Sequence, residues 1–280
     1  MPGDGDDSPK LPEELIEEIM ILLKGNIPAL RACSLASRTF QAISQPLIFQ
    51  NLVVIAGTLS SPDIVPDAIM AHRFLEILRN KPQIGSLVRS LHFYEANLRK
   101  GNPDGPLNEK TIAACLPHLR KLQFLSIHFP QTYGLKVIRK YSESFQKALL
   151  QIIKLPFLIS LNVWSMPLVL LKGKKGLKHI SIGGLGGMHA IKSSLVRPDD
   201  RCVIESMQMT FDAQRFIGRG HSLTLKRFLD HIVDLTNLKH LSLICCNVVE
   251  YQPAAALVLQ LCGKTLRRLV IDPRYPGKTP

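Results

Sequence analysis

Two Gly-Lys-Thr tripeptides are the most obvious candidates for catalytic chemistry in this 280-residue sequence. They begin at Gly263 and Gly277, and glycine followed by lysine and threonine is how a phosphate-binding loop ends. Such a loop also needs a glycine five residues before the one that precedes the lysine, so that bare backbone amides surround the phosphate. Val258 and Asp272 stand at those positions. The tripeptides therefore do not predict a nucleotide site.

The glycine-rich run at residues 183–187 fails a second nucleotide pattern. Its sequence is Gly-Gly-Leu-Gly-Gly, and His189 stands where the dinucleotide-binding motif requires its last glycine. The sequence also contains no recognisable set of nucleophile, base and orienting group. We therefore expect a protein that is not an enzyme and that needs no cofactor.

Histidine and cysteine are dispersed along the chain. The nine histidines form no His-Glu-x-x-His motif, and no Cys/His pair has zinc-ligand spacing. Cys245 and Cys246 are adjacent, which is poor geometry for a metal or redox site, and beside Asn247 they resemble one step of a structural repeat. We expect no metal site and an intracellular location, cytoplasmic, nuclear or both, because scattered cysteines fit a reducing compartment. The remaining cysteines are Cys33, Cys115, Cys202 and Cys262.

Several ring-bearing side chains lie between the apolar positions of predicted strands. We expect four histidines to lie on the surface of a sheet: His92, His128, His179 and His240. Tyr94, His128 and Trp164 are our candidates for binding a substrate on an exposed concave face, because aromatic side chains often anchor partners. The alternative for Tyr94 and Trp164 is a place in the core or at the edge of the sheet.

Charge is divided unevenly along the sequence. The formal net charge is +13, yet the first 23 residues hold seven acids and one lysine. A basic body favours an acidic partner, whether protein, nucleic acid or membrane surface, and a solvated basic surface is the alternative. The longest apolar runs fall far short of the about 20 residues of a membrane span. We expect a soluble protein with a disordered acidic tail over residues 1–9.

From Leu52 onward a repeated strand pattern organises the sequence. Residues 238–248 match L-x-x-L-x-L-x-x-(N/C)-x-L with valine at the last position, which is the pattern of a leucine-rich repeat. Weaker copies of the first six positions occur six more times, at irregular spacings of 19 to 36 residues. The apolar positions of these copies are Val88, Leu91 and Phe93; Leu122, Leu125 and Ile127; Leu158, Leu161 and Val163; Leu177, Ile180 and Ile182; Ile204, Met207 and Met209; and Leu266, Leu269 and Ile271.

Amphipathic segments precede five of these strand motifs by a short turn. The repeated order of helix, turn and strand predicts stacked units that share a parallel sheet, and the fold class is therefore α/β. Helices are expected over residues 68–78, 109–116, 143–153, 223–235 and 254–261.

The region before the repeats reads as a small helical unit. A helix is expected over 11–23 with glutamates near its positive end, a stop at 25–26 and a restart at Pro28. A second helix is expected to include 30–43, and Pro46 to close the unit. About forty residues cannot bury so much apolar surface among themselves and remain stable. Part of that surface must therefore face the rest of the chain or another protein.

This region resembles the F-box of fungal F-box proteins. The resemblance covers about residues 10 to 52 and consists of three blocks in the correct order. The blocks are Leu11-Pro12-x-Glu14-Leu15-Ile16-x-x-Ile19, then Leu30-Arg31-Ala32-Cys33-Ser34-Leu35-Ala36-Ser37-Arg38-Thr39-Phe40, then Pro46-Leu47-Ile48-Phe49. In that family the helical module docks onto the Skp-type adaptor of an SCF (Skp-cullin-F-box) ubiquitin ligase. The C-terminal part, often leucine-rich repeats, captures the substrate.

Carried over residue by residue, the resemblance assigns adaptor contacts in the first two blocks. The family commonly has tryptophan where Phe40 stands and often cysteine where Ser37 stands. Both departures reduce the surface available to an adaptor, because tryptophan offers more buried area. The assigned residues are Leu11, Pro12, Leu15, Ile16, Leu30, Cys33, Leu35 and Phe40.

The sequence thus predicts an acidic tail over 1–9, an F-box module over 10–55 and a leucine-rich-repeat-like solenoid over 56–280. The expected function is recruitment of a protein substrate for ubiquitin-dependent degradation, with the Skp-type adaptor and, through it, cullin as partners. One alternative is that the apolar helical face packs only on the repeats. The other is a basic scaffold that binds nucleic acid or an acidic protein, for which the sequence around residues 172–178 and Arg267-Arg268 is the motive.

Overall fold

The protein is described here by a computed structural model. The described residues are 11–56, 69–95, 107–128, 143–164, 171, 173–183, 201–211, 233–245, 256 and 258–273. The chain divides into two compact units, Met1–Asn51 and Leu52–Pro280. The expected boundary after residue 55 falls inside strand β1 (Asn51–Ala56), so the sheet begins earlier than the sequence predicted.

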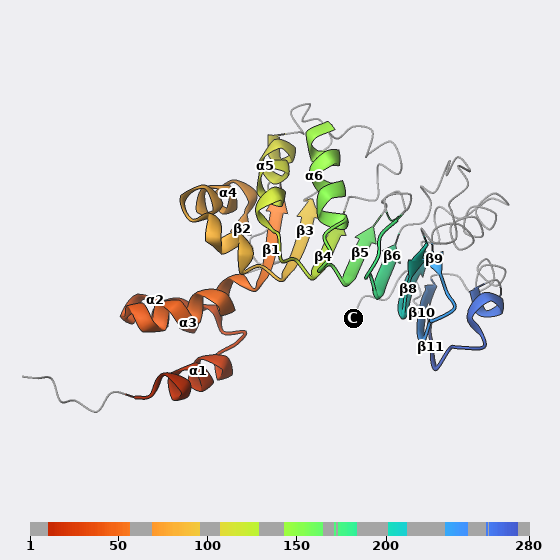
Figure 1. Ribbon diagram of the computed structural model, residues 1–280, viewed down its shortest axis with the longest axis horizontal. Helices are drawn as coiled ribbons and strands as arrows, with labels where there is room; N and C mark the ends of the chain where they lie inside the picture. The colour runs from red at the N-terminus through yellow and green to blue at the C-terminus, as the bar shows by residue number, and fades with distance from the viewer. Residues whose placement is uncertain are drawn as a thin grey trace, which may run out of the picture. The chain divides into compact units, whose positions relative to one another are not determined.

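The first unit contains three helices, α1 (Glu13–Leu22), α2 (Ile27–Ala36) and α3 (Arg38–Phe49) (Figure 1). The predicted stop after α1 is confirmed, since Gly25 adopts a positive φ of 101° that glycine tolerates without strain. Asn26 then caps α2, and its side-chain oxygen accepts a hydrogen bond from the Ala29 amide at 3.1 Å.

The second predicted helix is in fact two helices. Ser37 adopts extended backbone angles between them, and its hydroxyl accepts a hydrogen bond from the Phe40 amide at 3.2 Å. A serine that satisfies a free amide at a helix start favours a new helix over continuation of the old one. The prediction that Pro46 closes the unit was also wrong, because α3 continues through Pro46 to Phe49.

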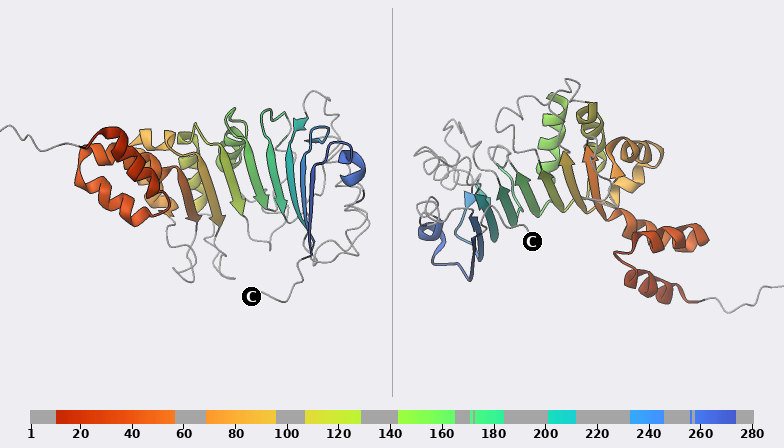
Figure 2. Two further views of the ribbon diagram at one scale, coloured as in Figure 1. Left: turned by 90° about the horizontal axis from the view of Figure 1, so that it is seen from below. Right: turned by 180° about the vertical axis from the view of Figure 1, so that it is seen from behind.

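The second unit is built on a nine-stranded sheet in the described part of the chain. After β1 and the short β2 (Ile69–Met70) the main strands are β3 (Ser90–Glu95), β4 (Phe124–His128), β5 (Ser160–Trp164), β6 (His179–Gly183), β8 (Ser206–Phe211), β10 (His240–Cys245) and β11 (Arg268–Pro273). From β3 to β11 each of these strands pairs in parallel with the next main strand along the chain (Figure 2). The predicted α/β class and parallel sheet are confirmed.

The apolar positions of the strand motifs stack in register across the sheet. Leu91 pairs with Leu125, Leu125 with Leu161, and the same row continues through Ile180, Met207, Leu241 and Leu269. The first position of each motif is fully buried from β3 through β10. These fully buried residues are Val88, Leu122, Leu158, Leu177, Ile204 and Leu238. One motif position therefore fills one layer of the core.

Helices α4 (Ala71–Asn80), α5 (Leu107–Cys115) and α6 (Glu143–Ile153) precede β3, β4 and β5 and lie on the same side of the sheet (Figure 1). They overlap the predicted helices, with α6 matching its prediction at both ends, and α5 continues into a short 3-10 turn, Leu116–His118. A second 3-10 turn, Pro82–Ser86, connects α4 to β3. Residues 258–262 are also helical and overlap the helix predicted over 254–261, ending one residue later.

The helix predicted over 223–235 is wrong at its end. Val233–Asp234 forms strand β9, which pairs in parallel with β7 (Cys202–Val203) in a separate two-stranded sheet. Val233 and Leu235 are both buried, and apolar residues two positions apart are compatible with a strand as well as with the end of a helix. The rest of that predicted helix lies outside the described residues. No helix in the described ranges is long and apolar enough to cross a membrane.

Replacement of one ladder residue tests the role of the stacked rows. Leu161 is 1% exposed, and we expect Leu161→Ala to lower the free energy of unfolding by about 2–5 kcal/mol, because the cavity left in a stacked row cannot collapse. The midpoint of urea unfolding, followed by circular dichroism, measures this. The matched control is Asn162→Ala, which truncates the half-buried next residue of the same strand and should cost much less. Equal losses of unfolding free energy in the two variants would contradict the assignment of Leu161 to the buried face of β5 and of Asn162 to its polar face.

Candidate functional site

Helix α1 exposes its apolar stripe. Met20 is the only fully buried residue of the helix, while Leu15, Ile19 and Leu22 are 47%, 48% and 85% exposed. With about 100° between successive residues, these three lie within about 60° of one another around the helix axis, while Leu11, which is 53% exposed, precedes the helix. A surface helix of a globular protein normally buries such a stripe against the core.

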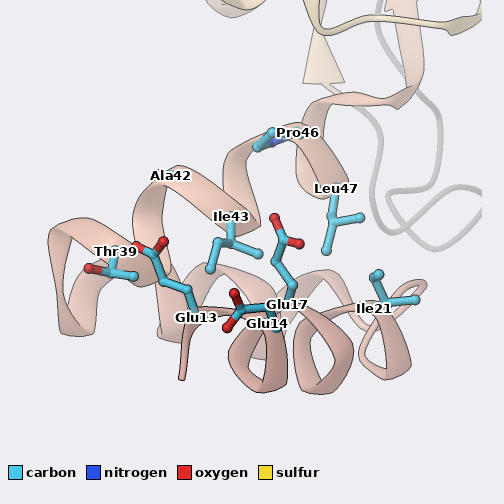
Figure 3. A pocket seen from close by; sticks show the side chains of 9 residues that line it. All are labelled: Glu13, Glu14, Glu17, Ile21, Thr39, Ala42, Ile43, Pro46 and Leu47. Carbon is cyan, nitrogen blue, oxygen red and sulfur yellow. The ribbon is translucent and has the colours of Figure 1, made fainter. Parts of the chain in front are cut away.

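The acidic side of α1 faces α3 instead. Glu13, Glu14 and Glu17 line a groove of about 540 Å³ between the two helices. Figure 3 shows Glu17 pointing from α1 toward α3, while Ile43 and Leu47 point from α3 toward α1. The rest of the lining is Ile21 from α1 and Thr39, Ala42 and Pro46 from α3. Three glutamates of α1 therefore line the open groove beside α3 while remaining exposed, and Leu15, Ile19 and Leu22 do not line it.

The eight residues assigned to an adaptor surface divide by exposure. Leu11, Pro12, Leu15 and Leu35 are exposed, Leu35 at 87%. Leu30 corrects the prediction, because it is fully buried and has no surface to offer a partner; it supports the unit from inside. The half-buried members are Ile16, Cys33 and Phe40.

Sequence reasoning missed Ile19 and Leu22 as surface residues. Both continue the exposed stripe of α1 at helical spacing from Leu15. The spacing of four and seven residues was present in the sequence. The sequence did not show which way the stripe faces. An apolar stripe normally faces the core of its own unit, so these residues were not expected at the surface.

The other candidate surface is the polar face of the sheet. Because side chains alternate along a strand, the residues between the buried positions form rows across this face. The central row, in register, is His92, Ser126, Asn162, Ser181, Gln208, Ser242 and Val270. Six of its seven members carry a hydrogen-bonding side chain. The Ser126 hydroxyl is buried and has no hydrogen-bond partner among the described residues.

The three predicted substrate-binding residues occupy adjacent places in the next row. The backbone of Tyr94 pairs with that of His128, and His128 pairs with Trp164. Adjacent strands of a sheet lie about 4.8 Å apart, so these positions are immediate neighbours. Tyr94 is half-buried, and the side chains of His128 and Trp164 lie outside the described part of the structure. The sheet thus brings together three positions that are far apart in the sequence.

The predicted surface histidines differ in environment. His179 and His240 are exposed, as expected. His92 is half-buried against Phe124, with ring centroids 4.8 Å apart and planes tilted by 38°. Burial lowers the pKa of His92, which keeps its ring neutral at physiological pH. A neutral imidazole has one donor and one acceptor nitrogen. His92 therefore adds a donor and an acceptor to the polar row that also contains Ser126.

Basic residues are concentrated at the edge of the sheet where strands β6, β8, β10 and β11 begin. Lys178, Glu205 and Lys239 are successive members of this edge, since each amide donates to the carbonyl of the preceding one. Glu205 accepts from both lysines, at 3.2 and 3.0 Å. Hydrogen bonds from Lys239 and Lys178 lower the pKa of Glu205. Arg267 comes next on the edge and is exposed.

Lys174 does not belong to this basic surface. It is 2% exposed and donates to the Leu155 carbonyl, and burial lowers its pKa. Of the basic stretch at residues 172–178 that motivated the scaffold hypothesis, Lys175 and Lys178 are exposed. That stretch therefore offers an acidic partner fewer cations than its sequence suggests.

The buried thiols are not activated. Burial raises the pKa of Cys115 to about 12 and that of Cys202 to about 11. A nucleophilic or metal-binding cysteine needs the opposite shift, because the thiolate is the reactive form. Among the described residues no group of His, Cys, Asp and Glu is arranged to hold a metal ion.

Comparison with known proteins yields no family model, no curated relative and no solved structure that matches the chain.

The Glu205 ion pairs predict a specific acid sensitivity. Because the pKa of folded Glu205 lies below that of the unfolded chain, the pairs stabilise the fold above about pH 4.3, and their contribution is lost as the pH falls through the folded pKa. We expect Glu205→Gln to reduce the difference between the urea midpoints at about pH 7 and about pH 3. The double variant Lys178→Met, Lys239→Met should reduce it similarly. Wild-type pH dependence in both variants would refute the pairing.

Proposed function

We propose that this chain is the substrate-recruiting subunit of an SCF-type ubiquitin ligase. Its helical unit would dock onto the Skp-type adaptor, and through it onto cullin, while the sheet binds a protein substrate. The observation that carries the proposal is the exposed stripe of α1, formed by Leu15, Ile19 and Leu22.

The stripe supports docking because exposing apolar side chains to water is unfavourable in free energy, and a partner that covers them recovers that free energy. Each leucine or isoleucine that moves from full exposure to full burial contributes about 1.5–3 kcal/mol. Three aligned apolar side chains left 47–85% exposed are therefore a substantial unused contribution. A partner helix laid along the stripe recovers it, in the way that amphipathic helices dock through residues spaced at i, i+4 and i+7.

Helices α2 and α3 offer a second point of attachment. Leu35, near the end of α2, is 87% exposed, and Phe40 in the first turn of α3 is half-buried. These residues stand in the second F-box-like block, so the same resemblance that assigns the α1 stripe also assigns them. Phe40 stands where the family commonly has tryptophan, and it would give the adaptor a smaller anchor.

The sheet supports the substrate-binding half of the proposal. Seven strands that repeat one apolar motif in register, most of them preceded by a helix, fit a leucine-rich-repeat-like solenoid. Its polar face presents the row from His92 to Ser242 and the neighbouring positions Tyr94, His128 and Trp164. Such a face recognises a partner through shape and distributed hydrogen bonds.

The proposed role requires no catalytic residues in this chain. Ubiquitin transfer would belong to other subunits, and this subunit would hold a substrate lysine near them. The protonated buried thiols are consistent with a binding protein. The site of action would be the cytoplasm, the nucleus or both.

Charge placed on the α1 stripe tests the docking half directly. We expect Leu15→Asp to weaken binding of a purified fungal Skp-type adaptor at least about tenfold, because an aspartate cannot be buried against an apolar partner. Biolayer interferometry with the full chain measures the affinity. The variant should remain folded, since Leu15 is already 47% exposed.

The matched control is Ile159→Asp, which makes the same change at an apolar residue of the sheet unit that is 40% exposed. It should bind the adaptor as tightly as the wild type. Wild-type binding by Leu15→Asp, or equal losses in the two variants, would overturn the docking model.

A second candidate function is a basic scaffold for nucleic acid, favoured by the exposed Lys178 and Arg267 and the half-buried Lys239 along the strand-entry edge. Glu205 neutralises part of that charge. Under the ligase proposal, we therefore expect RNA binding by the full chain to be lost at about 0.15 M salt.

Fluorescence anisotropy with a labelled single-stranded RNA measures this at several salt concentrations. The scaffold candidate would be favoured by binding that persists at physiological salt. It also requires that Lys178→Glu, Arg267→Glu reduce the slope of log Kd against log salt by about two. Arg120→Glu, Lys121→Glu, a pair of exposed cations elsewhere on the sheet unit, is the control.

A further inference from the structure

Two turns on the strand-entry edge are held against each other. They are residues 154–159, which precede β5, and residues 173–178, which precede its neighbour β6 (Figure 1). The buried Lys174 amine of the second turn donates to the Leu155 carbonyl of the first. The two turns therefore form one surface, which we call the paired turns.

The tips of the paired turns are exposed. Gly173 and Gly176 have positive φ angles of 73° and 81°, which glycine adopts without strain, and Lys175 is exposed between them. In the other turn Phe157 is 56% exposed and Ile159 is 40% exposed. Two apolar side chains thus face water in a turn that is bonded to the turn of Lys175.

Cations without partners accompany these apolar side chains. Lys154 is the first residue of the Phe157 turn and is exposed, as is Lys175 in the adjacent turn. Neither lysine has an ion-pair partner among the described residues. The same holds for Lys264 and Arg267, which are exposed farther along the edge. The paired turns therefore combine an apolar tip with positive charge that no carboxylate neutralises.

This combination matches the surface of an anionic phospholipid membrane. There, apolar side chains enter the boundary between headgroups and acyl chains, while Lys and Arg side chains contact the anionic headgroups. An RNA strand would use the cations, but its bases stack on successive aromatic rings, and Phe157 is the only Phe, Tyr or Trp in the two turns. An acidic peptide added as a strand would need open backbone groups, whereas the Lys178 amide already donates to the Ile159 carbonyl.

We propose that the paired turns dock this chain on an anionic phospholipid membrane. Phe157 and Ile159 enter the bilayer interface, and Lys154 and Lys175 contact the headgroups. The buried Lys174 is a positioning residue, because it holds the turn of Phe157 against the turn of Lys175. This contact is independent of adaptor docking, since α1 and the paired turns belong to different units.

Co-sedimentation of the full chain with lipid vesicles at about 0.15 M salt tests the proposal. We expect binding to phosphatidylcholine vesicles that contain about 30% phosphatidylserine, and none to phosphatidylcholine alone. The double variant Lys154→Glu, Lys175→Glu should weaken the binding at least about tenfold, because two attractions become two repulsions. Phe157→Ser should weaken it about fivefold or more, because the inserted ring is lost.

Phe157→Trp reports insertion directly. It should bind anionic vesicles as tightly as the wild type, because tryptophan is favoured at membrane interfaces. On binding, its fluorescence should shift to shorter wavelength relative to that of the wild type, which contains only Trp164. An unshifted spectrum on saturating anionic vesicles would overturn the insertion of Phe157.

Two controls match these changes away from the paired turns. Arg73→Glu, Lys110→Glu reverses the same charge at exposed residues of α4 and α5, and Ile271→Ser truncates an apolar residue of β11 that is 54% exposed. Both should bind anionic vesicles as the wild type does. Because every changed residue is exposed, all variants should keep the wild-type midpoint of urea unfolding.

Four results would overturn the proposal. The first two are no binding to anionic vesicles and equal binding to both kinds of vesicle. The third is anionic binding that is indifferent to Phe157→Ser or is lost equally in the controls. The fourth is a labelled single-stranded RNA that binds at this salt and loses affinity in Phe157→Ser while vesicles do not bind, because the paired turns would then be a nucleic-acid site.

Discussion

The in-register stacking of apolar side chains across the parallel strands is the constraint on which the sheet unit depends. Leu91, Leu125, Leu161 and their successors occupy one row, and each is at most 3% exposed from β3 to β10. The side chains of this row are buried because each strand's neighbours cover them. The same register fixes the opposite face. It sets His92, Ser126 and Asn162 in register on three neighbouring strands and does the same for the positions of Tyr94, His128 and Trp164.

Among the residues that the structure describes, two elements each carry several exposed apolar side chains. One is α1, whose exposed Leu15 and Ile19 do not line the groove that its glutamates line. The other is β11, where the buried rows reach solvent at Leu269 and Ile271. In both, the local sequence is compatible with a partner rather than with water.

Much of the sheet unit was predictable from sequence, because a motif with three fixed apolar positions specifies both the strand and the layer it fills. Helix α6 was predicted at both ends for the same reason, since its buried residues recur at helical spacing. Ser37 shows where pattern reading failed: periodicity continues across it, while a single hydroxyl cap divides the helix. Leu30 and Ile19 show the other limit. Both are apolar in an F-box-like block, and only packing decides that one is buried and the other exposed.

Hydrogen exchange of the full chain, with and without a purified Skp-type adaptor, tests the docking claim most directly. The account predicts that the adaptor slows exchange of the amides in α1, residues 13–22, because covering the Leu15–Leu22 stripe suppresses local opening of that helix. Strands β3 to β10 should exchange at unchanged rates. Protection confined to the sheet, or none anywhere at saturating adaptor, would contradict the assignment of α1 as the docking helix.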